Sequence, residues 1–521
     1  MQPSPSLTRR IVASAGIIGA SVLLSRVLGF FRNWTVAQQI GSNAATDAYF
    51  AAFTLPDFLN YLVAGGSLSL TFIPVIARCV AEKREEDAWH VFSTVITSMD
   101  ILLAAGIALG EIFAPALVRV IAPGFHGPQR ARVIFLTRLM LPAQIFFYQG
   151  GILSAVQYAK TKFVLPSLAP VVYNSCIIVA GVLLAHRIGI TGFAVGVLVG
   201  AFAGNFALQL YGARRVGARF RPNLNVRNED FRLFVKLSVP IMLGLSIVYT
   251  DDWIIRWFGS YLVPASITWL TYAKTLMQVP LGILGQAVGV ASFPFFAQLY
   301  SEGRLEELNR TLTATLKGVI LLVVPVSALT IVQRSPLVYF VFSHTRMHAL
   351  DLQATAATLA LFSVGMFAWG AQGILARGFY AARNTFTPVA VGTSIAFLSL
   401  PMYWALARHW QHLGLALSSS LAVMSYAFIL FVLFNRRMHH AHPAALVWFF
   451  IRVTAAAAFA ALVCARVCHI LEAHIRWHST HGAFLVLVGA TASALPVAVA
   501  FMKLFRIHEV NRYLKQLGIG W

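Results

Sequence analysis

The sequence predicts an all-α, multi-pass membrane protein with about fourteen transmembrane helices. Of its 521 residues, 58% are hydrophobic and only 11% are charged, and the mean hydropathy is +0.74. Soluble domains carry about 25% charged residues. Apolar stretches recur from residue 11 to residue 505, and the polar connections between them are too short to fold as separate domains.

Fourteen apolar runs are long enough to cross a bilayer, which takes roughly 20 residues of helix. Several contain Pro or Gly, which membrane helices tolerate where neighbouring helices or water satisfy the freed backbone groups. The approximate bounds of the runs are 11–32, 47–77, 91–121, 133–158, 164–185, 190–212, 233–258, 264–298, 312–333, 354–380, 386–407, 412–434, 446–469 and 482–505.

Basic residues set the predicted orientation. The net charge of +22 would suggest nucleic acid in a soluble protein, but here Lys and Arg collect in alternate connections, which indicates membrane topology and anionic lipid headgroups. The opposing loops are poorer in basic residues, although Arg130, Arg334 and Arg408 weaken the contrast. We expect both termini on the cytoplasmic side, together with the following basic residues: Arg9, Arg10, Lys83, Arg84, Lys160, Arg219, Arg221, Arg304, Lys503, Arg506, Arg512 and Lys515.

An internal repeat divides the chain. Residues 151–166 align without gaps on residues 373–388, at an offset of 222 that also pairs Gly192 with Gly414. At an offset of 220, three earlier residues match three later ones: Pro74, Ala77 and Glu82 with Pro294, Ala297 and Glu302. We expect a six-helix lobe over 1–222, a second over 223–440, and two additional helices with a basic tail over 441–521. Chance similarity between Gly-rich membrane segments is the alternative.

The repeat spans six segments, an even number, so both lobes have the same orientation in the membrane. Parallel repeats of this kind are typical of transporters that expose a central cleft to each side in turn. The sequence therefore favours two pseudo-symmetric lobes that work by alternating access.

Two arginines lie within the first apolar run. Arg26 sits about 22 Å along a helix that starts at Ile11. A cation at that depth normally faces a bundle interior or a watery cavity. Arg32 follows six residues later, offset by roughly 120° around the helix, and either lines the same cavity or reaches the outer interface. The nearest acidic residue is Asp47, so we expect an anionic ligand.

Other ionisable residues within the apolar runs are few. Asp47 would pair with Arg32 across the first outer loop, either as an ordinary structural ion pair or as part of the site. One of Asp251 and Asp252 would face the cavity as a cation or proton site, while the other pairs with Arg256. Lys274, in the middle of the eighth run, would hold an anion. Asp100 in the third run has no obvious partner in the sequence.

Enzyme motifs are missing. The sequence contains no GxxxxGK[ST] phosphate loop and no HExxH, and no paired carboxylates are placed for hydrolysis. Cys464, Cys468 and His469 would be a weak metal site, but small buried residues are the simpler interpretation. We therefore expect a transporter, with no metal and no cofactor.

Several motifs resemble the MurJ/MviN family of the multidrug/oligosaccharidyl-lipid/polysaccharide exporter superfamily. They are SRVLGFFRN at 25–33, ATDAYFAAF at 45–53, the sequence around Leu55-Pro56, APGF at 122–125, PLGI at 280–283 and GFY at 378–380. The similarity covers essentially the whole chain. It implies a flippase for lipid II, the undecaprenyl-diphosphate-linked peptidoglycan precursor, in the bacterial inner membrane.

The resemblance also implies site residues. Arg26 and Arg32 match the family's cavity arginines, and Asp47 matches an acidic residue after the first outer loop. Asp252 is similar to an acidic residue linked to cation binding. Two family arginines correspond here to Asn60 and to Thr275, which Lys274 precedes.

The implied partners are the lipid-linked diphosphate substrate, membrane lipids and cell-wall synthesis proteins, with no nucleic acid. Two alternatives stay open: export of another polyprenyl-diphosphate-linked glycan on the same scaffold, and a membrane scaffold that transports nothing.

Overall fold

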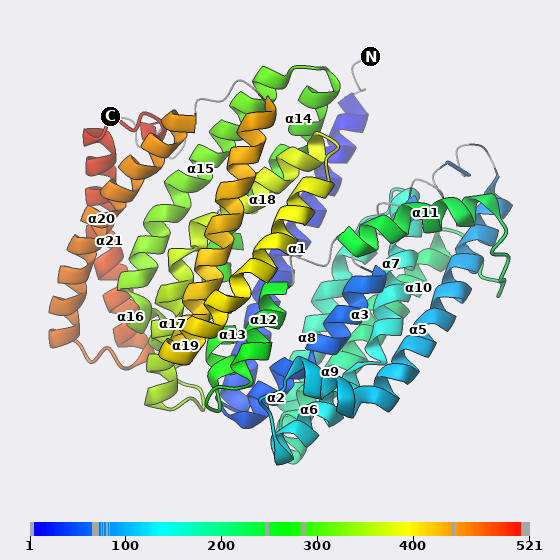
Figure 1. The fold of residues 1–521 in the computed structure, drawn as a ribbon, viewed down its shortest axis with the longest axis horizontal. Helices are drawn as coiled ribbons and strands as arrows, with labels where there is room; N and C mark the ends of the chain where they lie inside the picture. Colours follow the sequence, from blue (N-terminus) through cyan, green and yellow to red (C-terminus); the bar gives the residue numbers. More distant parts are fainter. Residues whose placement is uncertain are drawn as a thin grey trace. The chain divides into compact units, whose positions relative to one another are not determined.

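The computed structural model describes residues 5–64, 72–73, 76, 78–79, 82, 84–244, 250–282, 287–438 and 443–511. Every regular element in this part of the chain is helical, as the sequence predicts (Figure 1). Several residues used in the sequence argument lie outside the described part: Pro74, Ala77, Lys83, Arg512 and Lys515.

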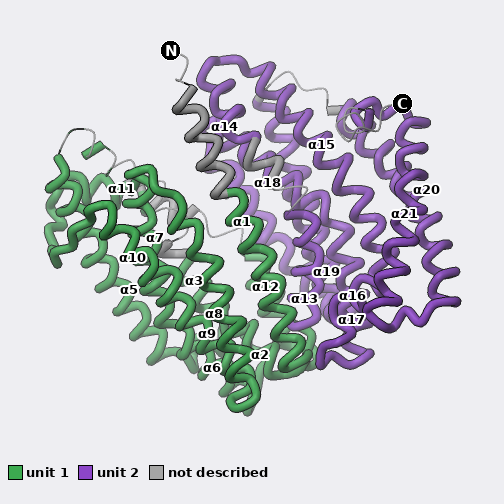
Figure 2. Tube along the Cα trace, turned by 180° about the vertical axis from the view of Figure 1, so that it is seen from behind, with its two compact units in different colours: residues 1–267 green, residues 268–521 purple. Residues whose placement is uncertain are grey.

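The chain forms two compact units, residues 1–267 and 268–521 (Figure 2). The seventh predicted span, 233–258, therefore packs with the first unit. These units are defined by which residues pack together. The division at 222 and 440 rests instead on sequence similarity between the repeats, and it stays a prediction.

In the first unit, α8 packs most extensively, against α9 on one side of the chain order and against α1 on the other. A buried cluster that includes Phe72, Phe92 and Tyr148 forms the core between α5 and α7. The helices are α1 (Pro5–Gln39), α2 (Ala44–Ala52), α3 (Thr54–Ala64), α5 (Glu85–Ile121), α6 (Gly127–Met140), α7 (Ala143–Ala159), α8 (Val164–Ile188), α9 (Thr191–Gly200), the π-helix η1 (Ala201–Ala207), α10 (Leu208–Arg215), α11 (Glu229–Gly244) and α12 (Thr250–Gly259).

In the second unit, α15 packs against both α18 and α20, and α20 pairs with α21 through small residues such as Ala460 and Ala490. The helices are α13 (Ser266–Leu281), which begins just before the boundary, α14 (Ala287–Ser301), α15 (Leu305–Val332), α16 (Arg334–Phe342), α17 (Ala349–Val364), α18 (Met366–Ala381), α19 (Phe386–Met438), α20 (Pro443–His474) and α21 (Thr480–Leu504).

The described residues include eight helical stretches long and apolar enough to cross a membrane, or nine when the bent pair α17 and α18 is taken as one span. Two of these stretches join consecutive helices, α6 with α7 and α9 through α10. Within the described residues α2 and α3 are each too short to cross alone, and α19 joins two predicted spans across a sharp bend.

The backbone repeats at the offset found in the sequence. Gly189 ends α8 with φ 59° and ψ −138°, and Gln411, 222 residues later, bends α19 with φ 53° and ψ −134°. Thr161 and Arg383, at the same offset, both have positive φ, 58° and 56°. Left-handed conformations are uncommon for residues other than glycine, so their recurrence at equivalent positions supports the repeat.

Gly192 and Gly414 have the same role in these two bends. A Cβ on Gly192 would lie 2.9 Å from Leu184 Cβ, and one on Gly414 would lie 2.0 Å from the Leu406 carbonyl oxygen. Leu184 and Leu406 are themselves 222 residues apart. Both helical hairpins therefore close on a glycine that contacts the equivalent residue of the preceding helix.

A third pair of equivalent structures lies at the offset of 220. Arg84 bonds Glu82 and Asp87 at 3.0 and 2.8 Å. Arg304 bonds Glu302 and Glu307 in the same way, through the equivalent atoms. In both loops these carboxylates raise the pKa of the arginine above its usual range, so both remain charged.

We expect Gly414→Ala to destabilise the protein by about 1–3 kcal/mol, because the new methyl group forces the two arms of α19 apart. The measurement is the unfolding midpoint of the purified protein in detergent. Gly106→Ala in α5 is the matched control, since nothing lies within 4 Å of its added Cβ. Equal midpoints for the two variants would contradict the close approach described here.

Candidate functional site

Arg26 and Arg32 both lie on α1, a continuous helix of 35 residues. Because α1 begins at Pro5, Arg26 lies about 32 Å along it, deeper than the sequence predicts. Arg26 is exposed on the surface of its unit, whereas Arg32 is half-buried against α8. The two side chains therefore leave the helix in different directions, as their spacing indicates.

Arg32 is held by neutral groups. Its Nε donates to Asn33 Oδ1 at 3.3 Å, and its Nη1 donates to Asn174 Oδ1 at 3.4 Å. Asn174 is fixed by its own amide, which donates to the Pro170 carbonyl at 2.9 Å. Within the described part of the chain no carboxylate forms an ion pair with Arg32. Both amide contacts are long, which leaves guanidinium hydrogen-bonding capacity for a further acceptor.

Two tyrosines and a carboxylate surround Arg32 at longer range. Tyr49, Tyr173 and Asp57 are each close enough to Arg32 to interact with it electrostatically. Tyr49 is 1% exposed, and its hydroxyl has no hydrogen-bond partner among the described residues. The vicinity of Arg32 therefore combines a cation, hydroxyl groups and amides, the groups that bind phosphate and sugar oxygens.

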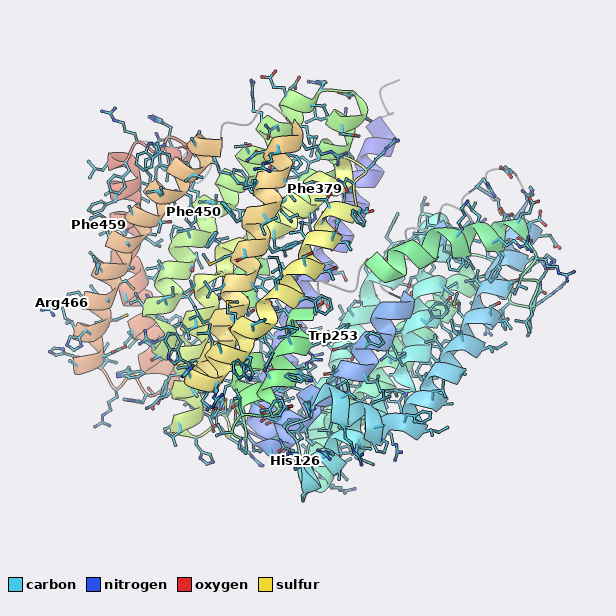
Figure 3. All side chains as sticks on the ribbon, viewed as in Figure 1. His126, Trp253, Phe379, Phe450, Phe459 and Arg466 are labelled. Atoms are coloured by element: carbon cyan, nitrogen blue, oxygen red, sulfur yellow. The ribbon has the colours of Figure 1, made fainter. Side chains whose placement is uncertain are left out.

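Asp57 is engaged by an arginine that comes 199 residues later. Arg256 Nη1 donates to Asp57 Oδ2 at 2.9 Å and to Thr54 Oγ1 at 3.5 Å. Asp252, one turn before Arg256 on α12, lies within electrostatic range of Asp57. Trp253, labelled in Figure 3, packs edge-on against Phe58, with 5.5 Å between the two ring centroids. Together these contacts fasten α12 to α3.

Asp47 is buried in the first unit. It is 1% exposed, and its Oδ2 accepts a hydrogen bond of 2.7 Å from the Ala265 backbone N–H. Ala265 has a φ of 77°, so the carboxylate stabilises a strained turn that precedes α13. A role of Asp47 in substrate binding stays a prediction.

The remaining predicted site residues divide between the units. Asn60 is half-buried on α3, one turn after Asp57. Lys274 and Thr275 belong to the second unit. Lys274 is 8% exposed and lies over the Trp369 ring, 5.1 Å from its centroid, while Thr275 Oγ1 donates within α13 to the Thr271 carbonyl at 2.7 Å. The structure thus places Arg26, Arg32, Asp47, Asn60 and Asp252 in the first unit.

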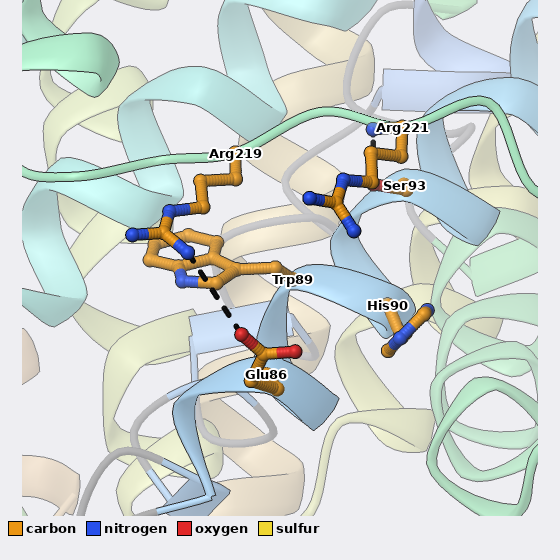
Figure 4. A pocket seen from close by; sticks show the side chains of 6 residues that line it. All are labelled: Glu86, Trp89, His90, Ser93, Arg219 and Arg221. Carbon is orange, nitrogen blue, oxygen red and sulfur yellow. Dashed lines mark hydrogen bonds and ion pairs between the residues drawn. The ribbon is translucent and has the colours of Figure 1, made fainter.

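A separate basic pocket lies at the start of α5, on the side predicted to be cytoplasmic (Figure 4). Arg219 pairs with Glu86 at 3.8 Å, and the backbone N–H of Arg221 donates to Ser93 Oγ at 3.1 Å. Trp89 and His90 complete its lining. None of the site residues predicted from the sequence belongs to it.

Sequence reasoning missed Asp57 and Asn174. Asp57 follows the Leu55-Pro56 motif inside an apolar run, and an acidic residue there is a usable signal. Asn174 carried no signal, because a single amide in an apolar helix gains its role only from the helix that packs on it.

We expect a coupling energy of about 1–2 kcal/mol between Asp57 and Arg256, since removing one partner leaves the other charge partly buried. The measurement is a double-mutant cycle of Asp57→Asn and Arg256→Gln, read as unfolding midpoints in detergent. The double variant should be more stable than the sum of the single effects predicts. Strict additivity would show that the ion pair contributes nothing.

Comparisons with known proteins show which family this chain resembles. Residues 36–488 match the family described as lipid II flippase MurJ. A lipid II flippase MurJ from Burkholderia cenocepacia is 26% identical and covers 93% of this chain and 94% of its own length. A probable lipid II flippase MurJ from Buchnera aphidicola is also 26% identical, over 81% of this chain and 82% of the relative.

Solved structures show the fold. A lipid II flippase MurJ in an inward closed conformation superposes with a TM-score of 0.78 at 20% identity, covering 95% of this chain and 99% of that chain. An inward-facing multidrug resistance transporter of the MATE family superposes with a TM-score of 0.66 at 14% identity, covering 82% of this chain and 98% of that chain.

This fold has fourteen transmembrane helices, in agreement with the sequence prediction. The family match extends over most of the chain. The matched range includes the Asp57–Arg256 ion pair, Tyr49, Tyr173 and Lys274. The chain belongs to the MurJ lipid II flippase family, and it is a multi-pass membrane transporter rather than an enzyme.

Proposed function

We propose that this chain carries lipid II across the bacterial inner membrane, with both termini in the cytoplasm. The observation that carries the site assignment is Arg32, a membrane-embedded guanidinium whose hydrogen-bond partners in the described structure are neutral amides. An arginine in an apolar environment needs a counter-charge or a polar cavity. A diphosphate supplies that charge, and its oxygens match the planar guanidinium in a bidentate arrangement.

Two other basic residues are proposed to bind the substrate. Arg26, exposed on α1, would contact the headgroup, and Lys274, in the second unit, would hold an anion as a point charge. Asn60 and Thr275 are neutral and would contribute hydrogen bonds to sugar or peptide groups rather than charge. Asp47 would act indirectly, by holding the turn at Ala265.

The last two helices would guide the polyprenyl tail. Large apolar side chains on α20 and α21 are exposed, among them Trp448, Leu462 and Leu485. Exposed side chains of this kind suit contact with acyl or prenyl chains. The tail would stay in the bilayer while the headgroup crosses between the lobes.

Transport would be driven by the membrane potential or by a cation gradient, because the sequence has no nucleotide-binding loop. Asp252 is the candidate for cation coupling. It lies near the Asp57–Arg256 pair, so a bound cation would change the charge balance that fastens α12 to α3.

We expect the wild-type chain to restore growth when the sole lipid II flippase of a host cell is depleted. Arg32→Ala should fail, because a charge-assisted hydrogen bond is worth about 1.5–3 kcal/mol and its loss weakens headgroup binding roughly ten- to hundredfold. Arg32→Lys should restore growth partly, since lysine keeps the charge but not the bidentate geometry. Arg26→Ala should also impair growth.

Arg119→Ala, an exposed arginine at the end of α5, is the matched control and should behave as wild type. Membrane levels of all variants are measured in parallel. Failure of the wild-type chain would remove the lipid II assignment and favour a different polyprenyl-diphosphate cargo. Full growth with Arg32→Ala would remove the assigned role of that residue.

A further inference from the structure

Asp100 lies in the middle of α5, an apolar helix long enough to span the membrane. It takes no part in the site around Arg32. Its Oδ2 accepts a hydrogen bond of 2.8 Å from Gln149 Nε2 on α7. Its Oδ1 is buried and has no hydrogen-bond partner among the described residues.

Hydroxyl groups without partners lie close to this carboxyl. Tyr148, next to Gln149 on α7, is 1% exposed, and its buried hydroxyl has no partner in the described structure. Asp100 is near enough to act on Tyr148 electrostatically. On α5, the hydroxyl of Thr97, one turn before Asp100 and on the same helix face, is likewise buried and without a hydrogen bond among the described residues. The carboxyl therefore has oxygen atoms around it but no compensating donor for Oδ1.

Several charged groups on α5 and on the helices that pack against it pair with one another. Among the described residues Asp100 forms no ion pair with a basic side chain. The neighbouring charges pair as follows: Glu111 of α5 with Arg138 of α6, Asp57 of α3 with Arg256 of α12, Asp230 of α11 with Arg78 and Arg84, and Glu85 of α5 with Lys160 after α7. On α7, Tyr148 is a titratable group on which Asp100 acts electrostatically.

A carboxylate in such surroundings is costly unless its charge is neutralised. One neutral amide bond does not neutralise it. A proton removes the charge and turns Oδ1 into a donor for a nearby hydroxyl oxygen. A sodium ion balances the charge and takes carboxylate, hydroxyl and carbonyl oxygens as ligands, as hard cations prefer.

We propose that Asp100, with the Tyr148 and Thr97 hydroxyls, forms an intramembrane binding site for a monovalent cation, H⁺ or Na⁺, in the first unit. The site is distinct from Asp252 and does not depend on which lipid the protein carries.

The test uses the full chain purified in detergent, without lipid substrate, so its outcome is independent of the proposed transport function. Infrared difference spectra during pH titration report a protonated carboxyl through its C=O stretching band. Unfolding midpoints in NaCl against equimolar choline chloride report sodium binding. The variants are Asp100→Asn and, in case that variant folds poorly, Tyr148→Phe, which removes a hydroxyl that has no partner. Glu111→Gln in the same helix is the control.

A protonated-carboxyl band near neutral pH that Asp100→Asn abolishes would identify the proton as the occupant. A sodium-dependent rise in midpoint that Asp100→Asn abolishes would identify sodium. In either case Tyr148→Phe should require about a tenfold higher concentration of the ion for the same response. Glu111→Gln should respond at the same ion concentration as wild type. If neither the band nor the sodium shift differs between wild type and Asp100→Asn or Tyr148→Phe, the proposal is wrong.

Discussion

The structure depends on one constraint: a charged side chain inside an apolar helix bundle must find a partner. Most of the described intramembrane charges meet it locally. Arg256 satisfies Asp57, the Ala265 backbone satisfies Asp47, and Trp369 covers Lys274. The hydrogen bonds described for Arg32 and Asp100 go to neutral side-chain amides. These two residues carry the two proposals, an anion site and a cation site.

The same pairing explains how the chain divides into compact units. The seventh span belongs to the second lobe by sequence repeat, yet it packs with the first unit. Asp230 at the start of α11 pairs with Arg78 and Arg84, and Arg256 on α12 pairs with Asp57. Electrostatic pairing therefore joins residues that the repeat assigns to different lobes.

Much of the fold was predictable because hydropathy and repeats are local properties of the sequence. The helical class, the apolar spans and the offset of 222 all follow from residue order, and the matching bends at Gly189 and Gln411 carry the same offset in the backbone. The partners of charged residues were not predictable. Asp57 and Arg256 are 199 residues apart, and Asn174 meets Arg32 only because α8 packs against α1.

The central claim is that Arg32 is kept available for a diphosphate. Its most direct test is equilibrium binding of undecaprenyl lipids to the purified protein, comparing a diphosphate-linked with a monophosphate-linked headgroup. The account predicts that wild type binds the diphosphate lipid more tightly, and that Arg32→Ala loses most of this preference while binding the monophosphate lipid nearly as well. An unchanged preference in Arg32→Ala would contradict the claim.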